Sequence, residues 1–378
     1  MHFIFFSLIV YYLFYFLIEL VYIIVQTIMG GKSMPFSNRK KLVVTILATS
    51  IVASGCGFNF PKDANEINPP KKIEVVSKTE TKKSIKQGYV LREIYLIDSN
   101  GFVVPQTVQV KADNSAIKQA LDLLVQGGPV TELLPDGFRG VLPADTVIKS
   151  VNLKDDGTLV IDFSPEFKNY NKSDEMLVMQ SIGWTATQFN NVKNVKLRIN
   201  GIDQNVMPVA KTPIGEGLNR DLGINLVKSD VVDIMNSKPI TVYYLSQVGK
   251  LNYYVPVTKR IPMEKTDMYA AVVEELVKGP SYSSNLLSDF NSDVELLETP
   301  KAQNGQLTLN FNENIFTNAD KKEISKFALN SLVLSLTEQP GVEKVSIQVN
   351  GKGNLLDEDG KSLTKPVIRP SHINTGKY

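Results

Sequence analysis

Cys56 is the only cysteine in the 378-residue chain and the first candidate for chemistry. A single thiol forms no internal disulfide, and a structural metal site takes several Cys or His ligands. A catalytic thiol is normally activated by a neighbouring base, most often His. The two histidines, His2 and His372, lie at opposite ends of the chain. The residue types therefore argue against a site built around Cys56 inside a folded domain.

The residues before Cys56 favour a processing signal instead. Three basic residues at 39–41 precede the apolar run 42–52, and small residues at 53–55 follow it. This order is typical of a secretory signal peptide. Because the small residues end at Cys, the stretch resembles a bacterial lipobox, although Leu is more usual at the position of Ala53. The resemblance implies a diacylglycerol on Cys56 and cleavage before it; the alternatives are a plain transmembrane anchor or a buried free cysteine.

A second apolar segment, 3–28, precedes this signal and is long enough to span a bilayer, which takes about 20 residues. Either it is an additional span, or translation begins at Met34, from which a complete lipoprotein signal can be read. We favour Met34, because lipoprotein signals act from a short N-terminus. In both cases residues 1–56 are excluded from reasoning about the fold.

The composition of the remainder limits the classes of function. Four of the 41 Lys/Arg and one of the 39 Asp/Glu lie in 1–56, so residues 57–378 hold 37 basic and 38 acidic side chains. This balance argues against a nucleic-acid partner, which requires a basic face. Residues 57–88 are rich in Lys, Ser, Thr and Pro and are predicted to be a disordered tether. The rest suits about two domains.

The chain contains a long internal repeat. Four blocks recur in the same order at offsets of 148 to 151 residues, which indicates a duplicated domain. The pairs are "ALDLLVQGGP" with "AVVEELVKGP", "DGTLVIDFSPEF" with "NGQLTLNFNENI", "VKNVKLRING" with "VEKVSIQVNG", and "RDLGIN" with "RPSHIN". We predict a first domain at 89–225, a linker at 226–238 and a second domain at 239–374.

Each copy reads as β-β-α-β-β-α-β. Glycines at 157 and 305 predict hairpin turns, and Gly-Pro pairs end the first helix of each copy. Ser115 and Ser173/Asp174 are expected helix caps. Strands and helices in this order predict a two-layer α+β domain with both helices on one face of a sheet. The predicted cores are Ile117, Leu121, Met179, Ile182 and Val160 in the first copy, and Val272, Leu276, Leu329, Leu332 and Leu309 in the second.

These blocks resemble the GerMN-domain family over roughly 89–374, through the Gly-Pro helix ends, "VIDFSPEF" and the Asn-Gly strand ends. The resemblance implies a fold similar to the ring-building motif of secretion-system proteins. It also implies a lipoprotein outside the mother-cell membrane that helps to assemble the transenvelope channel between mother cell and forespore. The implied partners are SpoIIQ and SpoIIIA-type channel components. The implied role covers sporulation and germination, with no enzymatic activity, cofactor or metal.

Residue types for catalysis are sparse. Neither copy contains a histidine before the tail, so a Ser-His-Asp arrangement within a domain is excluded. Asp162 and Glu166 are the best candidates for the carboxylate pair of a wall glycosidase. They correspond to Asn310 and Asn314 in the second copy, which favours a solvated strand edge. A peptidoglycan-binding or peptidoglycan-modifying protein remains the alternative function; a solute-binding lipoprotein is a third, weaker reading.

Aromatic residues mark the candidate partner surface. An alternating aromatic strand must turn half of its side chains away from the core, and tyrosine is enriched at protein interfaces. Packing within the sheet and within the core is the alternative for these residues. Arg220 and Arg369, each followed by Ile-Asn, are expected to pin the tail of each copy to its sheet. Trp184 is expected on the longer helix, where it is either a carbohydrate-stacking platform or a core residue. The candidate surface consists of Tyr243, Tyr244, Tyr253, Tyr254 and Trp184.

Overall fold

The computed structural model describes residues 88–128, 131–134, 136–227, 233–265 and 267–375. All of them fall within one of the two units into which the chain divides, Asn65–Tyr378. The predicted signal, Cys56 and all but the last residue of the predicted tether lie outside the described residues. Among the helices that are described, none is both long enough and apolar enough to cross a membrane.

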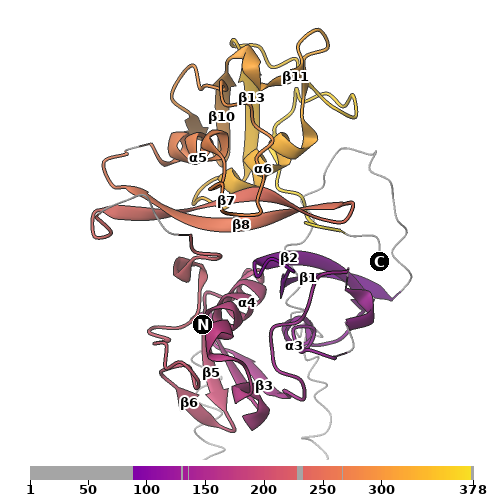
Figure 1. The fold of residues 1–378 in the computed structure, drawn as a ribbon, viewed down its shortest axis with the longest axis vertical. Coiled ribbons are helices and arrows are strands. Elements are labelled where there is room, and N and C mark those ends of the chain that lie inside the picture. Colours follow the sequence, from indigo (N-terminus) through magenta and orange to yellow (C-terminus); the bar gives the residue numbers. More distant parts are fainter. Residues whose placement is uncertain (1–87, 129–130, 135, 228–232, 266, 376–378) are drawn as a thin grey trace, which may run out of the picture. The chain divides into compact units, whose positions relative to one another are not determined.

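The first repeat follows the predicted order and adds a short strand after the turn at Asn200–Gly201 (Figure 1). Its elements are β1 (Tyr89–Ile97), β2 (Val103–Lys111), α3 (Ala116–Asp122), β3 (Ile148–Leu153), β4 (Thr158–Phe163), α4 (Glu175–Thr187), β5 (Asn194–Ile199) and β6 (Ile202–Gln204).

The second repeat has the same order, with short additional strands around its second helix. Its elements are β7 (Ser237–Val248), β8 (Leu251–Pro262), α5 (Met268–Lys278), β9 (Lys301–Gln303), β10 (Gln306–Phe311), β11 (Phe316–Asn318), β12 (Glu323–Ile324), α6 (Lys326–Thr337), β13 (Lys344–Val349), β14 (Leu356–Asp357) and β15 (Val367–Ile368).

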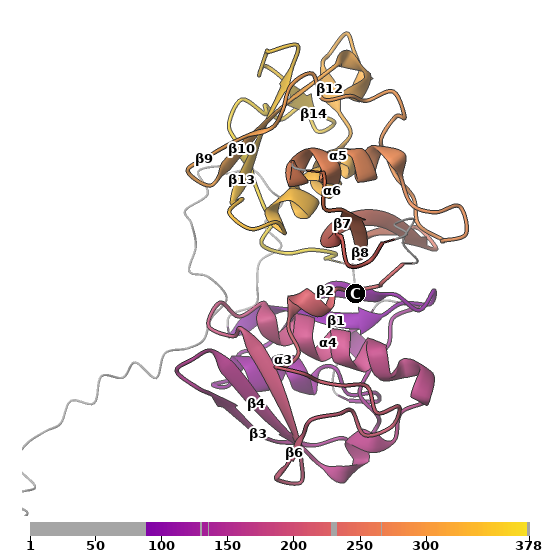
Figure 2. The same cartoon turned by 90° about the vertical axis from the view of Figure 1, so that its left-hand side faces the viewer.

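The larger sheet of each repeat is built around a crossover helix. Strands β4 and β5 are parallel and joined through α4, while β10 and β13 are parallel and joined through α6. The sheet orders are β3-β4-β5-β6 and β15-β13-β10-β9. The helices of each repeat cover one face of its sheet (Figure 2). The α+β class and the tandem copies are therefore confirmed.

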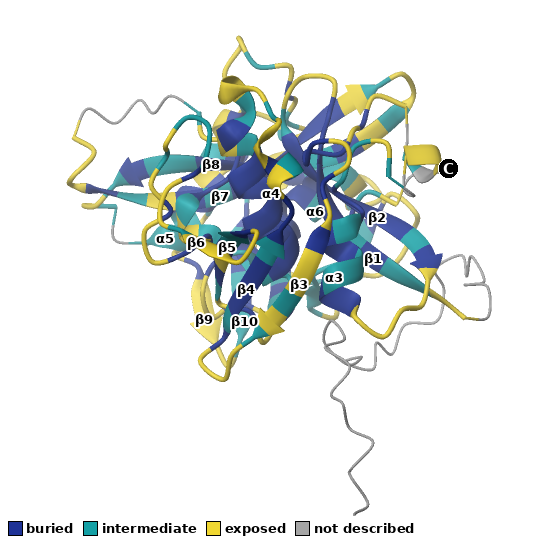
Figure 3. Cartoon of the chain, turned by 90° about the horizontal axis from the view of Figure 1, so that it is seen from below, coloured by how far each residue is buried: buried dark blue, intermediate teal, exposed yellow. Residues whose placement is uncertain are grey.

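The first hairpin of each repeat does not join this sheet. Strands β1 and β2 form their own two-stranded sheet, as do β7 and β8. Each hairpin packs on the side of the helices that faces away from the larger sheet (Figure 2). The reason lies in helix α4, most of which is buried (Figure 3). A helix that is buried all round needs cover on both sides, and the hairpin supplies the second cover.

The core agrees with the predicted residues except at one strand. The predicted helix residues of both repeats and Leu309 lie in the main apolar cluster. Val160 is buried but lies outside that cluster, which contains Leu159, Ile161 and Phe163 instead. Successive side chains of a strand point to opposite faces, so Val160 lies on the outer face of the sheet. The prediction for Val160 is therefore wrong by one residue.

The turns are as predicted, whereas the caps differ. Gly157 and Gly305 have φ of 88° and 73°, in the left-handed region that a tight hairpin turn requires. Ser115 and Asp174 occupy N-cap positions, but neither side chain makes a capping hydrogen bond. Helix α3 ends at Asp122, before the Gly-Gly-Pro that was expected to stop it. The residues after Asp122 leave the helix, and Val125 forms an isolated β-bridge with Leu142.

Candidate functional site: the junction of the two repeats

Each repeat ends in an asparagine that contacts strands of both repeats. The side chain of Asn225 accepts a hydrogen bond from the Val103 N–H at 2.7 Å and donates one to the Val103 carbonyl at 2.7 Å. Its Nδ2 also donates to the carbonyl of Pro256, in β8, at 2.8 Å. A side-chain amide that exchanges both hydrogen bonds with one residue takes the place of a neighbouring strand. Asn225 therefore bridges β2 and β8.

Asn374 makes the equivalent contacts from the second repeat. Its Oδ1 accepts from the Tyr254 N–H at 2.8 Å, and its Nδ2 donates to the Tyr254 carbonyl at 2.9 Å. The same Nδ2 donates to the carbonyl of Pro105, in β2, at 2.7 Å. Each tail is thus pinned to its own hairpin, as predicted, and also to the hairpin of the other repeat. We call Asn225, Asn374 and the strand segments that they bridge the asparagine clamp.

The clamp is locally two-fold symmetric. Val103 and Pro105 precede Tyr254 and Pro256 by 151 residues each, so each asparagine reaches the equivalent groups of the two strands. Such an exchange of identical contacts is typical of an isologous interface between two subunits. The prolines fit this edge, because a residue without an N–H leaves no donor unpaired there.

A pair of threonines extends the symmetry. Thr107 donates from Oγ1 to the carbonyl of Ile373 at 2.7 Å. At the equivalent position, the N–H of Thr258 donates to the carbonyl of Ile224 at 2.8 Å, and Thr258 Oγ1 accepts from the Ile224 N–H at 2.9 Å. The Ile-Asn dipeptide of each tail therefore contacts the opposite repeat through both of its residues.

A charged cluster lies beside the clamp. Glu338, just after α6, forms an ion pair with Arg220 of the first repeat and a second one with Arg369 at 3.1 Å. Tyr243 donates a hydrogen bond to Glu338 at 3.0 Å. The Arg220 guanidinium also lies 4.3 Å from the centre of the Trp184 ring, within range of a cation–π contact. This cluster joins the two repeats electrostatically.

Burial and charge act in opposite directions on the carboxyl group of Glu338. Burial raises its pKa, but the guanidinium groups of Arg220 and Arg369 lower it by more, so the pKa lies below its usual value. For both arginines, burial lowers the pKa while Glu338 and the neighbouring tyrosines raise it, and the net change is upward. All three groups are therefore held in their charged forms.

The predicted aromatic surface lies almost entirely inside the molecule. Trp184, Tyr243, Tyr244 and Tyr253 are at most 2% exposed, and Tyr254 is partly buried. Tyr253 donates a hydrogen bond to Asp98 of the first repeat at 2.8 Å. Tyr244, on β7, donates one to the carbonyl of Glu275 in helix α5 of the same repeat. These residues do not form a free surface for another protein. The interface for which tyrosine was expected lies between the repeats of one chain.

The two candidate carboxylates, Asp162 and Glu166, each accept a hydrogen bond. Asp162 accepts from the N–H of Gly201 at 2.9 Å, and Asn310 accepts from the N–H of Gly351 at the same distance. The substitution between the repeats therefore keeps this hydrogen bond. A hydrogen bond from Ser164 holds the pKa of Glu166 below its usual value, whereas a general acid needs a raised pKa.

One structural carboxylate was missed by the sequence analysis. Glu175 is buried and accepts hydrogen bonds from Tyr170 and from the backbone N–H groups of Val209, Ala210 and Thr212. Burial raises its pKa, but these hydrogen bonds outweigh burial and lower the pKa to about 2. The donors lie more than 30 residues away in sequence, apart from Tyr170, so no local pattern signals the contact.

Within the described part of the chain, no group of His, Cys, Asp and Glu side chains is arranged to hold a metal ion. The candidate lipidation site, Cys56, lies outside that part and stays a prediction. The site with the best-defined geometry is the junction formed by the clamp and the charged cluster. Its arrangement holds the two repeats together.

Comparison with known proteins gives consistent matches. The family model Germane, described as sporulation and spore germination, matches residues 93–205 and 241–354. Spore germination protein GerM of Bacillus subtilis (strain 168) is 49% identical over 356 residues, covering 88% of this chain and 97% of that protein. The solved tandem GerMN domains of the B. subtilis sporulation protein GerM match with a TM-score of 0.72 and 53% identity, covering 76% of this chain and 100% of that one.

Proposed function

Because this chain belongs to the Germane family of sporulation and spore germination proteins, we propose that it is a non-enzymatic scaffold held at the membrane by lipid on Cys56. The observation that carries the proposal is the asparagine clamp. It joins the two repeats through hydrogen bonds from each asparagine to the hairpin of the other repeat. Two joined repeats, each with its own sheet, suit a brace between other proteins.

The proposed location is the outer face of the mother-cell membrane, which faces the space between mother cell and forespore. There the chain helps to assemble or stabilise the transenvelope channel through contacts with SpoIIQ and SpoIIIA-type components. This part of the proposal follows from the GerMN resemblance. A fold like the ring-building motif would place its sheets and helix faces against these partners.

The non-enzymatic character is supported by the carboxylates. Asp162 accepts a hydrogen bond from the Gly201 N–H, and Asn310, whose amide is not an acid, accepts the equivalent bond from the Gly351 N–H in the second repeat. The alternative of a wall hydrolase therefore loses its best candidate pair. A purified fragment 57–378 that released muropeptides from peptidoglycan would overturn the scaffold proposal.

Site-specific crosslinking in sporulating cells tests the partners. A photo-crosslinking amino acid at Lys196, which is exposed on the outer face of the first sheet, is expected to capture channel components identified by mass spectrometry. The same amino acid at Tyr244, which is 2% exposed, is the matched control and is expected to capture none. Capture of wall synthases alone at Lys196 would contradict the channel role.

The anchor is tested separately by metabolic labelling with an alkyne fatty acid. The Cys56→Ser variant is expected to lose the label completely, because the chain has no other cysteine. Ser54→Ala keeps a small residue before the cleavage point and is expected to keep the label. Label that persisted in Cys56→Ser would exclude the lipobox interpretation.

A further inference from the structure

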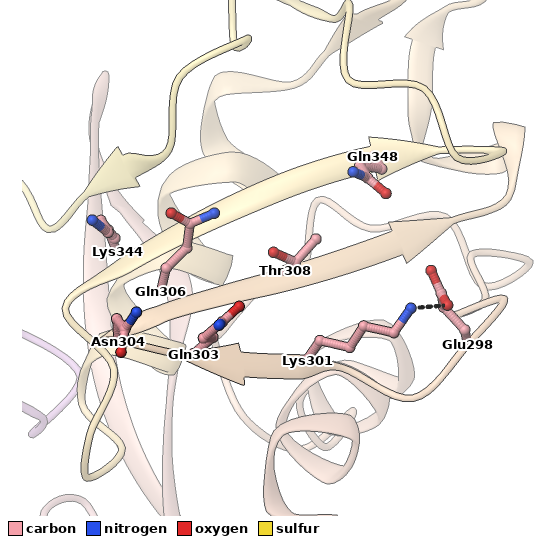
Figure 4. A pocket seen from close by; sticks show the side chains of 8 residues that line it. All are labelled: Glu298, Lys301, Gln303, Asn304, Gln306, Thr308, Lys344 and Gln348. Atoms are coloured by element: carbon pink, nitrogen blue, oxygen red, sulfur yellow. Dashed lines mark hydrogen bonds and ion pairs between the residues drawn. The ribbon is translucent and has the colours of Figure 1, made fainter.

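The outer face of the second sheet carries a polar hollow. It has a volume of about 480 Å³ and lies over strands β9, β10 and β13 (Figure 4). Apart from Glu298 and Asn304, which lie outside the strands, the side chains in Figure 4 rise from these strands on the face that points away from the helices. The residues that matter for the argument are Lys301, Gln303, Gln306, Thr308, Lys344 and Gln348.

Strand register makes this face a grid of polar groups. Gln306 of β10 pairs with Gln303 of β9 on one side and with Lys344 of β13 on the other. In the next row of the same face, Thr308 lies opposite Lys301. Paired residues of adjacent strands have side chains about 5 Å apart, so hydrogen-bonding groups follow one another at short intervals.

Most of these groups are unused. Within the described residues, the side chains of Gln303, Gln306, Thr308, Gln348 and Lys344 have no hydrogen-bond or ion-pair partner. Lys301 is the exception, because it pairs with Glu298 at 2.5 Å. Three amides, a hydroxyl and an ammonium group are therefore available to a ligand on one face of one sheet.

The first repeat provides an internal comparison. Val160 stands where the second repeat has Thr308, and Arg198 stands where it has Gln348. Arg198 is already paired with Asp203, at 2.5 Å. The same face of the same fold is therefore partly apolar and internally paired in the first repeat. The open polar face belongs to the second repeat and is not a general consequence of the fold.

We propose that this face of the second repeat binds a glycan strand that carries N-acetyl groups and carboxylates, as peptidoglycan does. Amide and hydroxyl side chains donate to and accept from sugar hydroxyls and acetamido groups. The ammonium group of Lys344, which has no ion-pair partner among the described residues, complements the carboxylates. The lining contains no aromatic ring, so affinity at one site is low and accumulates along a polymer by multivalency. This contact is independent of the channel scaffold and would position it against the wall.

Co-sedimentation with purified sacculi tests the proposal. Fragment 57–378 is suitable, because the matching tandem domains of the B. subtilis relative were solved over 76% of this chain. Sacculi are used before and after removal of teichoic acids, and retention of the fragment is expected on both. Retention that disappears with the teichoic acids would instead identify a phosphate polymer and overturn the glycan assignment.

Variants locate the contact. Gln306→Ala with Gln348→Ala is expected to weaken retention roughly tenfold, since each lost hydrogen bond contributes about 0.5–1.5 kcal/mol. Lys196→Ala with Asn152→Ala changes exposed residues of the first repeat's sheet and is the matched control, with retention unchanged. Equal losses in both variants, or no retention of the unmodified fragment, would refute the proposal. Circular dichroism confirms that every variant is folded, and the crosslinking of channel partners is read independently.

Discussion

Asn225 and Asn374 stand at equivalent positions in the two repeats and bind the same two strands, β2 and β8, in opposite order. Each side chain makes three hydrogen bonds, two to its own hairpin and one to the other hairpin. The two repeats of this chain are thus paired like the subunits of a symmetric dimer. The pairing is closed, because each hairpin edge at the clamp is occupied by the tails of the same molecule.

The clamp predicts coupled losses of stability. Asn225→Ala and Asn374→Ala are each expected to lower the free energy of unfolding by about 1–3 kcal/mol, because each leaves buried backbone groups unpaired. The double variant is expected to lose less than the sum, since both residues hold the same strands. Urea unfolding measures all three variants.

Asn252→Ala serves as the control for this series. Asn252 lies on β8, near the clamp, but its side chain is exposed. Its replacement is expected to change the free energy of unfolding by less than about 0.5 kcal/mol. If the clamp variants were no less stable than this control, the clamp would not hold the repeats together.

The charged cluster predicts a strong effect of one carboxylate. Glu338→Gln leaves Arg220 and Arg369 without their shared counter-ion and is expected to lower the free energy of unfolding by about 3 kcal/mol. Replacing Arg220 by Met in the same chain is expected to recover part of this loss. The readout is thermal unfolding of the single and double variants.

An exposed ion pair on α3 gives the comparison for Glu338. Asp122→Asn breaks the pair between Lys118 and Asp122, whose side chains are 39% and 38% exposed. Exposed pairs contribute about 0–1 kcal/mol. A loss for Glu338→Gln as small as the loss for Asp122→Asn would show that the cluster is a surface feature without a structural role.

Local patterns in the sequence predicted the parts of each repeat. The Asn-Gly and Asp-Gly turns, the hairpins and the order of strands and helices follow from glycine positions and from periodicity. The parallel pairing of the strands that flank α4 and α6 does not follow from these local patterns. The repeated Ile-Asn tails predict that each tail is pinned to the sheet of its own repeat, and the structure places this contact at the separate two-stranded hairpin sheets. Their second contact was not predictable, because Asn374 and Pro105 are 269 residues apart.

What covers an apolar or aromatic face was not predictable either. Alternation shows that one side of β7 and β8 must leave the core of its own repeat, and it says nothing about what that side meets. Tyr253 therefore qualified as a partner-binding residue, whereas its hydroxyl binds Asp98 of the first repeat. The same limit explains Val160, which is buried although it lies on the outer face of the sheet.

Glu175 predicts a dependence of stability on acid pH. Its pKa of about 2 in the folded chain lies below the value near 4.3 of an unfolded glutamate. Its stabilising contribution is therefore complete above about pH 4.3 and is lost as the pH falls towards 2. Unfolding free energies of the wild type and Glu175→Gln are expected to differ at pH 6 and to converge near pH 2.

The expected difference in unfolding free energy between the wild type and Glu175→Gln follows from the lowered pKa of Glu175. At about 1.4 kcal/mol per pKa unit, it is about 3 kcal/mol at neutral pH. Glu343→Gln, which removes an exposed carboxylate, controls for the general loss of one negative charge. A difference between the wild type and Glu175→Gln that stayed constant from pH 6 to pH 2 would exclude the proposed role of the ionised carboxylate.

Asp162 separates a structural role from a catalytic one. Asp162→Asn is expected to change the free energy of unfolding by less than about 0.5 kcal/mol, because Asn310 makes the same hydrogen bond in the second repeat. Asp162→Ala leaves the Gly201 N–H without this acceptor and is expected to cost about 1 kcal/mol. Urea unfolding of both variants distinguishes them. If Asn were as damaging as Ala, the negative charge itself would matter, and the carboxylate would again be a candidate for chemistry on the wall.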